Sequence, residues 1–156
     1  MIRTLHQWAG QLAIRLADAR RPRLSLGVRL LALDEAGGVF LVRHSYLPGL
    51  HLPGGAVDAG ESCREAAVRE AAEEGGLLLA APPGLFQVYR STAGGRRDHV
   101  LLYVARGARQ LRPARPGLEI LSAGFHPLAR LPADLTAPTR RRIAEVLEGE
   151  PPSEVW

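Results

Sequence analysis

Residues 55–77 of the chain read GAVDAGESCREAAVREAAEEGGL, an acidic segment with glycines near both ends. It places Glu70, Glu73 and Glu74 at positions i, i+3 and i+4 of an expected helix, next to Arg69. At about 100° per residue, the three carboxylates fall within about 100° of arc. Like charges at these spacings repel and destabilise a helix unless a cation neutralises them. The spacing therefore indicates a cation site, and oxygen ligands of this kind suit Mg²⁺ or Mn²⁺.

An acidic helix face is most often a solvated surface, so the neighbouring residues have to decide between that reading and a metal site. Gly54 and Gly55 precede the helix, let the backbone approach closely and offer a carbonyl to a metal. Arg69 lies beside Glu70, where it can fix the rotamer of that carboxylate, and Glu61 lies two helical turns away from Arg69. These neighbours favour the metal site.

The ends of this helix are marked by local signals. Ser62 and Glu65 form a capping-box pattern at its start. Gly75 and Gly76 predict an end near Glu74. The face opposite the carboxylates is small and apolar, and we expect it to pack on the core through Val68, Ala71 and Ala72.

The remaining elements follow from hydrophobic periodicity and from turn residues. Helices are expected over residues 3–20 and 136–148, and β-like runs over 24–33, 39–43, 77–79, 85–91, 99–105 and 119–126. Loops are expected over 44–60 and 107–117. The pattern predicts one α/β (α+β) domain over 1–156: an α/β/α sandwich with a mixed central sheet, a core over 24–148 and a helical extension over 1–22.

Composition excludes several classes of protein. The chain has 156 residues, 46% apolar and 23% charged, with a net charge of +4 from 20 basic and 16 acidic residues. Every basic residue is arginine, which excludes Schiff-base enzymes and standard P-loop NTPases because both need lysine. Cys63 is the single cysteine, and no apolar run approaches the roughly 20 residues that span a bilayer. We therefore expect a cytoplasmic protein without a membrane partner.

The sequence resembles the Nudix hydrolase family. The family signature is Gly, five residues, Glu, seven residues, Arg-Glu, an aliphatic residue, any residue, Glu-Glu, any residue, Gly and an aliphatic residue. Those places are held here by Gly55, Glu61, Arg69, Glu70, Ala71, Glu73, Glu74, Gly76 and Leu77. Ala71 is small where a larger aliphatic residue is common. The run Leu52-Pro53-Gly54-Gly55 is similar to the family's lead-in, and weaker similarity extends over residues 24–148.

The resemblance implies a metal-dependent hydrolase that cleaves the pyrophosphate bond of a nucleoside diphosphate linked to another group, by water attack at phosphorus. The implied metal ligands, for Mg²⁺ or Mn²⁺, are the carbonyl of Gly54 and the carboxylates of Glu70, Glu73 and Glu74. Arg69 would orient Glu70, with Glu61 supporting Arg69 from behind. We expect Glu70 to be the base, with Glu119 as an additional ligand or base. The expected catalytic residues are Glu70, Arg69, Glu73 and Glu119.

Substrate contacts are expected from the loop that precedes the signature, which carries His44, Tyr46 and His51, and from Arg112. The proline that marks the ADP-ribose type is absent from residues 85–98, and residues 41–53 do not match the coenzyme A type. The substrate is therefore expected to be a small nucleotide whose identity stays open.

The sequence is compatible with two alternative functions. One is a pyrophosphohydrolase of RNA 5′ ends, although the chain lacks an aromatic-interleaved basic stripe that would favour nucleic acid. The other is a non-catalytic nucleotide-binding module of the same fold, which would be free to lose its metal carboxylates. The apolar stripe around Trp8 is interpreted as packing or as the contact of a homodimer.

Overall fold

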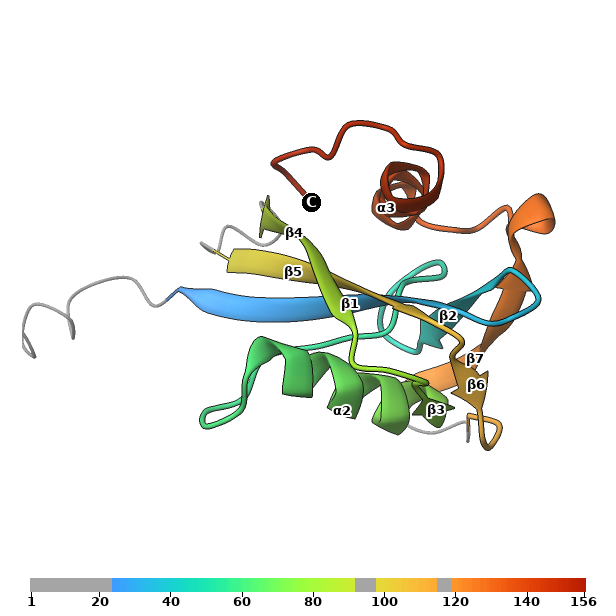
Figure 1. Ribbon diagram of the computed structural model, residues 1–156, viewed down its shortest axis with the longest axis horizontal. Coiled ribbons are helices and arrows are strands. Elements are labelled where there is room, and N and C mark those ends of the chain that lie inside the picture. Colours follow the sequence, from blue (N-terminus) through green and yellow to red (C-terminus); the bar gives the residue numbers. More distant parts are fainter. Residues whose placement is uncertain (1–23, 92–97, 115–118) are drawn as a thin grey trace, which may run out of the picture.

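A five-stranded mixed sheet forms the centre of the protein (Figure 1). The computed structural model describes residues 24–91, 98–114 and 119–156. The strand order is β4-β5-β1-β2-β7, with bounds β4 Gly84–Ser91, β5 Asp98–Arg106, β1 Ser25–Leu33, β2 Gly38–His44 and β7 Ile120–Pro127. β1 pairs in parallel with β5, whereas the other pairs are antiparallel.

The sheet is open between β1 and β2. β1 pairs with β5 along its whole length, but it pairs with β2 only at the turn end, where Leu33 faces Val39. The gap is filled by the signature loop, which we define as residues 52–57. Its backbone joins β1 through Val28 N–Gly55 O (2.9 Å), Leu30 N–Pro53 O (2.9 Å) and Val57 N–Leu26 O (3.0 Å). The loop therefore takes the place of a paired strand, and its geometry is set by β1.

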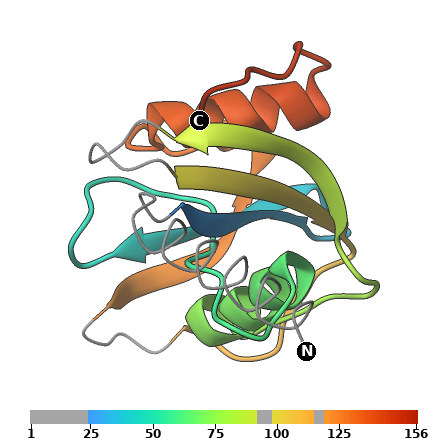
Figure 2. The same ribbon diagram turned by 90° about the vertical axis from the view of Figure 1, so that its left-hand side faces the viewer.

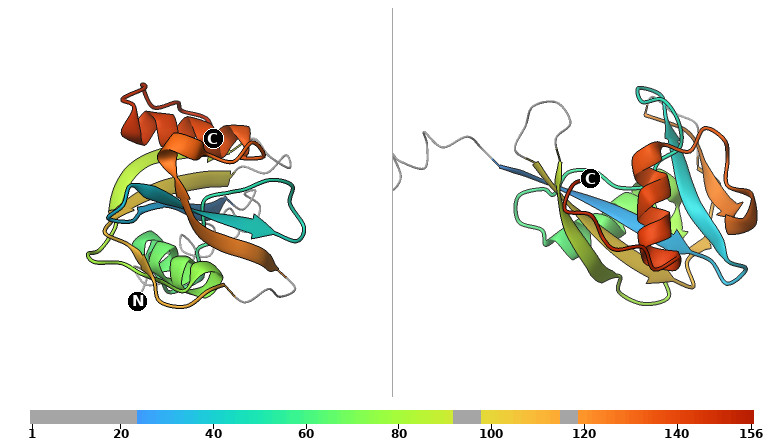
Figure 3. Two further views of the ribbon diagram at one scale, coloured as in Figure 1. Left: turned by 90° about the vertical axis from the view of Figure 1, so that its right-hand side faces the viewer. Right: turned by 90° about the horizontal axis from the view of Figure 1, so that it is seen from above.

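One helix covers each face of the sheet (Figures 2 and 3). α2 (Cys63–Gly75) packs over one core cluster, and α3 (Ala137–Leu147) packs over the other. Alternation along β1 serves both clusters, because Leu30 points to the α2 side and Leu31 to the α3 side. The expected α/β/α sandwich with a mixed sheet is confirmed.

The expected ends of α2 are confirmed, but its expected packing face is wrong in part. Ser62 and Glu65 make the reciprocal capping box, and Gly76 ends the helix in the left-handed region at φ 61°. The face that packs on the sheet is Ala66, Ala67, Ala71 and Gly75. Val68, expected in the core, is 41% exposed. The packed face is therefore centred nearer to Glu70 and Glu74, so these carboxylates lie at the edge of the interface instead of opposite it.

Smaller elements complete the fold. β3 (Leu77–Leu78), in a run expected to be β-like, pairs with β6 (Arg109–Gln110) in a separate two-stranded sheet. β6 lies within residues 107–117, which were expected to be only loop. A 3₁₀ turn, η2 (Leu128–Arg130), leads towards α3. The expected N-terminal helix and residues 92–97 and 115–118 lie outside the described residues.

A cluster around a buried ion pair of α3 connects this helix, the C-terminal residues and the edge strand β4. Arg142 on α3 is fully buried, donates to Glu145 Oε1 at 2.5 Å and stacks on the ring of Tyr89, with its Cζ 4.2 Å from the ring centroid. The Tyr89 hydroxyl donates to Glu145 Oε2 at 2.7 Å. Trp156 closes the cluster with an edge contact to Tyr89, and its backbone N–H donates to Arg90 O at 3.1 Å.

Replacing Glu145 by alanine should destabilise the fold strongly. The Arg142 guanidinium would lose its carboxylate while remaining buried, which costs about 3–5 kcal/mol of unfolding free energy. Urea unfolding measures the change. Glu148→Ala at the exposed end of the same helix is the matched control, with an expected change within about 0.5 kcal/mol. Equal losses for the two variants would contradict the structural role of the pair.

Candidate active site

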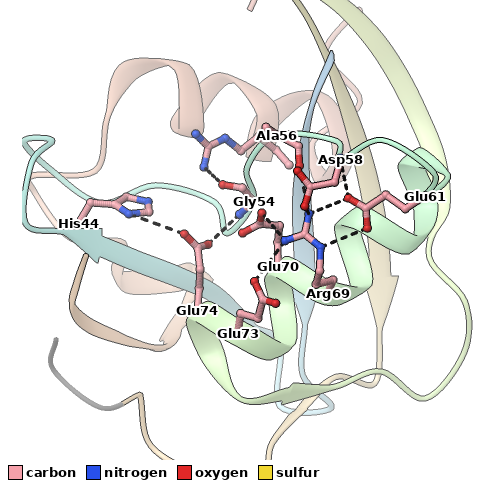
Figure 4. Close-up of polar contacts among 10 residues, drawn as sticks. His44, Gly54, Ala56, Asp58, Glu61, Arg69, Glu70, Glu73 and Glu74 are labelled. Carbon is pink, nitrogen blue, oxygen red and sulfur yellow. Dashed lines mark hydrogen bonds and ion pairs between the residues drawn. The ribbon is translucent and has the colours of Figure 1, made fainter. Parts of the chain in front are cut away.

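Arg69, in the middle of α2, is the centre of a carboxylate cluster. Its Nε and Nη2 donate to both carboxylate oxygens of Glu61, at 3.1 and 2.7 Å. Its Nη1 donates to Glu70 Oε1 at 2.9 Å and to Glu73 Oε2 at 3.2 Å, and Nη2 also reaches the carbonyl of Ala56 at 3.1 Å. Figure 4 shows Arg69 between Glu61 and the two carboxylates of α2. One guanidinium therefore fixes three acidic side chains and the signature loop.

The charges of this cluster stabilise one another. Hydrogen bonds from Arg69 hold the pKa of Glu61 below its usual value, and those to Glu61 and Glu70 raise the pKa of Arg69. Because Arg69 stays charged at every accessible pH, it orients the carboxylates without titrating itself.

Glu74 stands apart from that cluster and faces the signature loop. Its Oε2 accepts from the backbone N–H of Gly54 at 2.8 Å, and its side chain is 12% exposed. Burial raises the pKa of Glu74 to about 7, against the opposing effects of the Gly54 hydrogen bond and the Arg29 charge. A buried carboxylate with such a pKa has too little positive charge around it, so a bound cation would favour its ionised form.

The two glycines of the signature loop are needed because of close backbone and carboxylate contacts. Gly54 has φ +144°, and a Cβ there would lie 2.1 Å from the carbonyl oxygen of Val28. A Cβ on Gly55 would lie 2.4 Å from Glu70 Oε1. Any larger residue would therefore push the loop off β1 or push Glu70 out of place.

Arg29 on β1 is a residue of this site that the sequence interpretation missed. Its Nη1 donates to the carbonyl oxygens of Leu52 at 3.0 Å and Gly54 at 2.8 Å. Burial lowers its pKa, and the charge of Glu74 acts in the opposite direction. An available signal was its position as the one charged residue in the apolar run over 24–33.

The side chains of the preceding loop come together beside Glu74. His44 is buried, and its Nδ1 lies 3.7 Å from Glu74 Oε1. Neither ring nitrogen has a hydrogen-bond partner within the described residues, and burial lowers the pKa of His44 to about 4. The rings of Tyr46 and His51 lie 5.2 and 5.6 Å from that of His44. The three residues of this loop that were predicted to contact the substrate therefore form one aromatic cluster, in which Tyr46 is 64% exposed.

Arg112 and Glu119 also lie near Glu74. Arg112 lines a small pocket of about 110 Å³ together with Glu73 and Glu74. The backbone carbonyl of Glu119 accepts from the N–H of Ser45 at 2.8 Å, and the negative charge of Glu119 contributes to the raised pKa of Glu74. The fold thus brings these two predicted residues, which are distant in sequence, to the same region.

The comparisons identify the class of protein. A family model described as the NUDIX domain matches residues 23–147, and the chain belongs to the Nudix hydrolase family. Enzymes of this family generally use divalent metal ions.

Individual relatives are similar over most of the chain. It is 34% identical over 108 residues, 68% of this chain and 72% of the other, to a protein of Bacillus subtilis (strain 168) named "Putative 8-oxo-dGTP diphosphatase". The crystal structure of a MutT NUDIX hydrolase from Burkholderia pseudomallei matches with a TM-score of 0.66 and 27% identity, covering 80% of this chain and 98% of that one. An ADP-ribose pyrophosphatase from Streptococcus suis 89-1591 matches with a TM-score of 0.58 and 25% identity, covering 87% and 96%.

The carboxylate oxygens of Glu70, Glu73 and Glu74 are suitable ligands for a hard dication, but here they accept hydrogen bonds from groups of the protein. Within residues 24–91, 98–114 and 119–156, no three side chains of His, Cys, Asp or Glu surround a common point in the manner of a metal site. Glu70 and Glu73 turn to Arg69, and Glu74 turns to Gly54. The oxygen-only donor set favours Mg²⁺ or Mn²⁺ over softer metals. In the part of the chain that the structure describes, no helix is long and apolar enough to cross a membrane.

Gly55→Ala should damage the site while sparing the fold. The new Cβ would displace the flexible end of Glu70 and not a backbone segment. We expect hydrolase activity to fall about 10²-fold, the usual effect of a small misplacement of a reacting group. The melting temperature should change by no more than a few degrees, of the order set by about 1 kcal/mol in a domain of this size.

Gly84→Ala on β4 is the matched control, because a Cβ there meets no atom within 4 Å. Activity and melting temperature of both variants are compared with the wild type. If Gly55→Ala kept full activity, the contact between Gly55 and Glu70 would have no functional importance.

Proposed function

We propose that the protein is a metal-dependent pyrophosphohydrolase that cleaves a nucleoside diphosphate linked to another group. The observation that carries this proposal is the cluster in which Arg69 binds Glu61, Glu70 and Glu73 and the Ala56 carbonyl of the signature loop. Membership of the Nudix hydrolase family supports it. A pyrophosphate is a polyanion, so the site needs cations as well as a base for its hydrolysis.

In the proposed mechanism Glu70 takes a proton from the attacking water. The oxygen of this water forms a bond to one phosphorus, and the bond from that phosphorus to the bridging oxygen breaks. Arg69 holds Glu70 Oε1, which leaves the second carboxylate oxygen for the water. Glu61 keeps Arg69 in place through its two-point contact, and Glu119 supplies a further negative charge near Glu74.

Glu70, Glu73, Glu74 and the Gly54 carbonyl are the proposed holders of Mg²⁺ or Mn²⁺. When bound, such ions neutralise the phosphate charge and lower the pKa of a coordinated water. Glu73 is the most accessible of these carboxylates, with its side chain 61% exposed, so it can turn from Arg69 to a cation with little rearrangement.

The substrate that we propose to test first is an oxidised purine nucleoside triphosphate. The support is the 34% identity to the Bacillus subtilis relative named for 8-oxo-dGTP. The exposed ring of Tyr46, next to His44 and His51, offers a stacking surface for a planar base. Arg112 lies where it can meet a phosphate. We propose a cytoplasmic location, consistent with the single free cysteine, Cys63.

Glu73→Gln should lower turnover by at least about 10-fold. Loss of a residue that only hydrogen-bonds to a metal ligand already lowers metal affinity or activity by about 10–100-fold. The assay measures phosphate or nucleotide release with Mg²⁺ or Mn²⁺ from 8-oxo-dGTP, dGTP, ADP-ribose and 5′-triphosphorylated RNA. Glu35→Gln in the turn between β1 and β2 makes the same chemical change at an exposed residue and should keep full activity.

The panel separates the competing functions. Turnover of RNA alone would replace the small-nucleotide proposal by the RNA 5′-end function. Binding of nucleotides without turnover of any would identify a non-catalytic module. Equal turnover by wild type and Glu73→Gln would contradict the role given to this carboxylate.

A further inference from the structure

Arg29 is a charged residue in the largely buried middle of β1. Its neighbours Val28 and Leu30 are at most 1% exposed, and β1 is flanked by β5 on one side. A charged side chain is rarely retained in such a strand unless it is paired or has a function.

The guanidinium is only partly used by the protein. Nη1 binds the carbonyl oxygens of Leu52 and Gly54, and these contacts hold the signature loop against β1. Nε and Nη2 have no acceptor among the described residues, and the residue as a whole is partly exposed. Donors on two of the three nitrogens therefore remain available to a ligand.

The charge of Arg29 has no direct partner either. In the described part of the chain, no carboxylate oxygen lies within 4 Å of its nitrogens, although Glu74 and Glu70 are near enough to influence it. Arg142, whose role is structural, is instead paired with Glu145 at 2.5 Å. The structural buried arginine is thus paired directly with a carboxylate, whereas Arg29 lies beside the carboxylate cluster with only carbonyl acceptors among the described residues.

We propose that Arg29 contacts the substrate, donating from Nε and Nη2 to a non-bridging oxygen of the pyrophosphate. A guanidinium matches the geometry of phosphate oxygens and is always charged, so it suits this task better than lysine. Its contact with the Gly54 carbonyl places it next to the Glu74–Gly54 pair, where the metal-bound phosphates would lie if the proposed function holds. The inference rests on that proposed function for the identity of the ligand.

Binding of methylenediphosphonate, a pyrophosphate analogue with CH₂ in place of the bridging oxygen, tests this role without turnover. Calorimetry in Mg²⁺ should show Arg29→Gln binding the analogue about 10- to 100-fold more weakly than wild type, the effect of losing a hydrogen bond between charged groups. Arg29→Lys keeps the charge but loses the forked donor geometry of the guanidinium, so it should bind the analogue more tightly than Arg29→Gln and more weakly than wild type. In kinetic assays the loss should fall mainly on KM and less on kcat.

Two measurements separate substrate contact from a structural role. Mn²⁺ affinity of Arg29→Gln, followed by electron paramagnetic resonance, should equal or exceed that of wild type, because the variant removes a nearby positive charge. Arg106→Gln, at the far end of the paired strand β5, removes the same charge from an exposed site and should bind the analogue like wild type.

The outcomes decide the inference in either direction. Unchanged analogue binding by Arg29→Gln, or a loss of Mn²⁺ binding equal to the loss of analogue binding, would overturn it and leave Arg29 as a support of the loop. Failure of wild type to bind the analogue would overturn it too. A failed turnover assay with Arg29-dependent analogue binding would instead contradict only the proposed function.

Discussion

The site depends on one constraint: the signature loop runs in the gap between β1 and β2 and is hydrogen-bonded to β1 as if it were a strand. Gly55 O and Pro53 O accept from β1 at 2.9 Å, and Gly54 approaches so closely that a Cβ would meet the Val28 carbonyl. Because α2 begins soon after this loop, its position sets where Glu70 and Glu74 lie. The same closeness explains why glycine is required at both positions: one faces the strand, and the other faces a carboxylate.

Charge balance explains the remainder of the arrangement. Glu74 lies at the edge of a packed interface, where desolvation opposes its ionised form and raises its pKa to about 7. Arg69 neutralises the cluster from the helix side, and Arg29 contributes positive charge from the sheet side. The Arg142–Glu145 pair on the other face of the sheet shows what a purely structural buried pair looks like in this protein. A divalent ion is the group that would complete the balance at Glu74.

Much of the fold could be predicted because its signals are local. The capping box at Ser62, the left-handed glycine at 76 and the strand periodicities all act within a few residues, so the bounds of α2 and the main strands agree with expectation. The prediction for Val68 was wrong because periodicity shows that a helix has a packing face but not where the core lies around it. β6 was missed because two residues carry too little pattern and depend on their partner β3.

The sequence by itself determined the chemistry that is available: the spacing of Glu61, Arg69, Glu70, Glu73 and Glu74 follows from the helical repeat and a short loop, and it identifies the family. Only the tertiary structure decided which distant groups join them. Arg29, His44, Arg112 and Glu119 reach the same region through strand pairing and backbone hydrogen bonds between segments far apart in the chain. Such contacts depend on how the sheet is assembled, and no local pattern records that assembly.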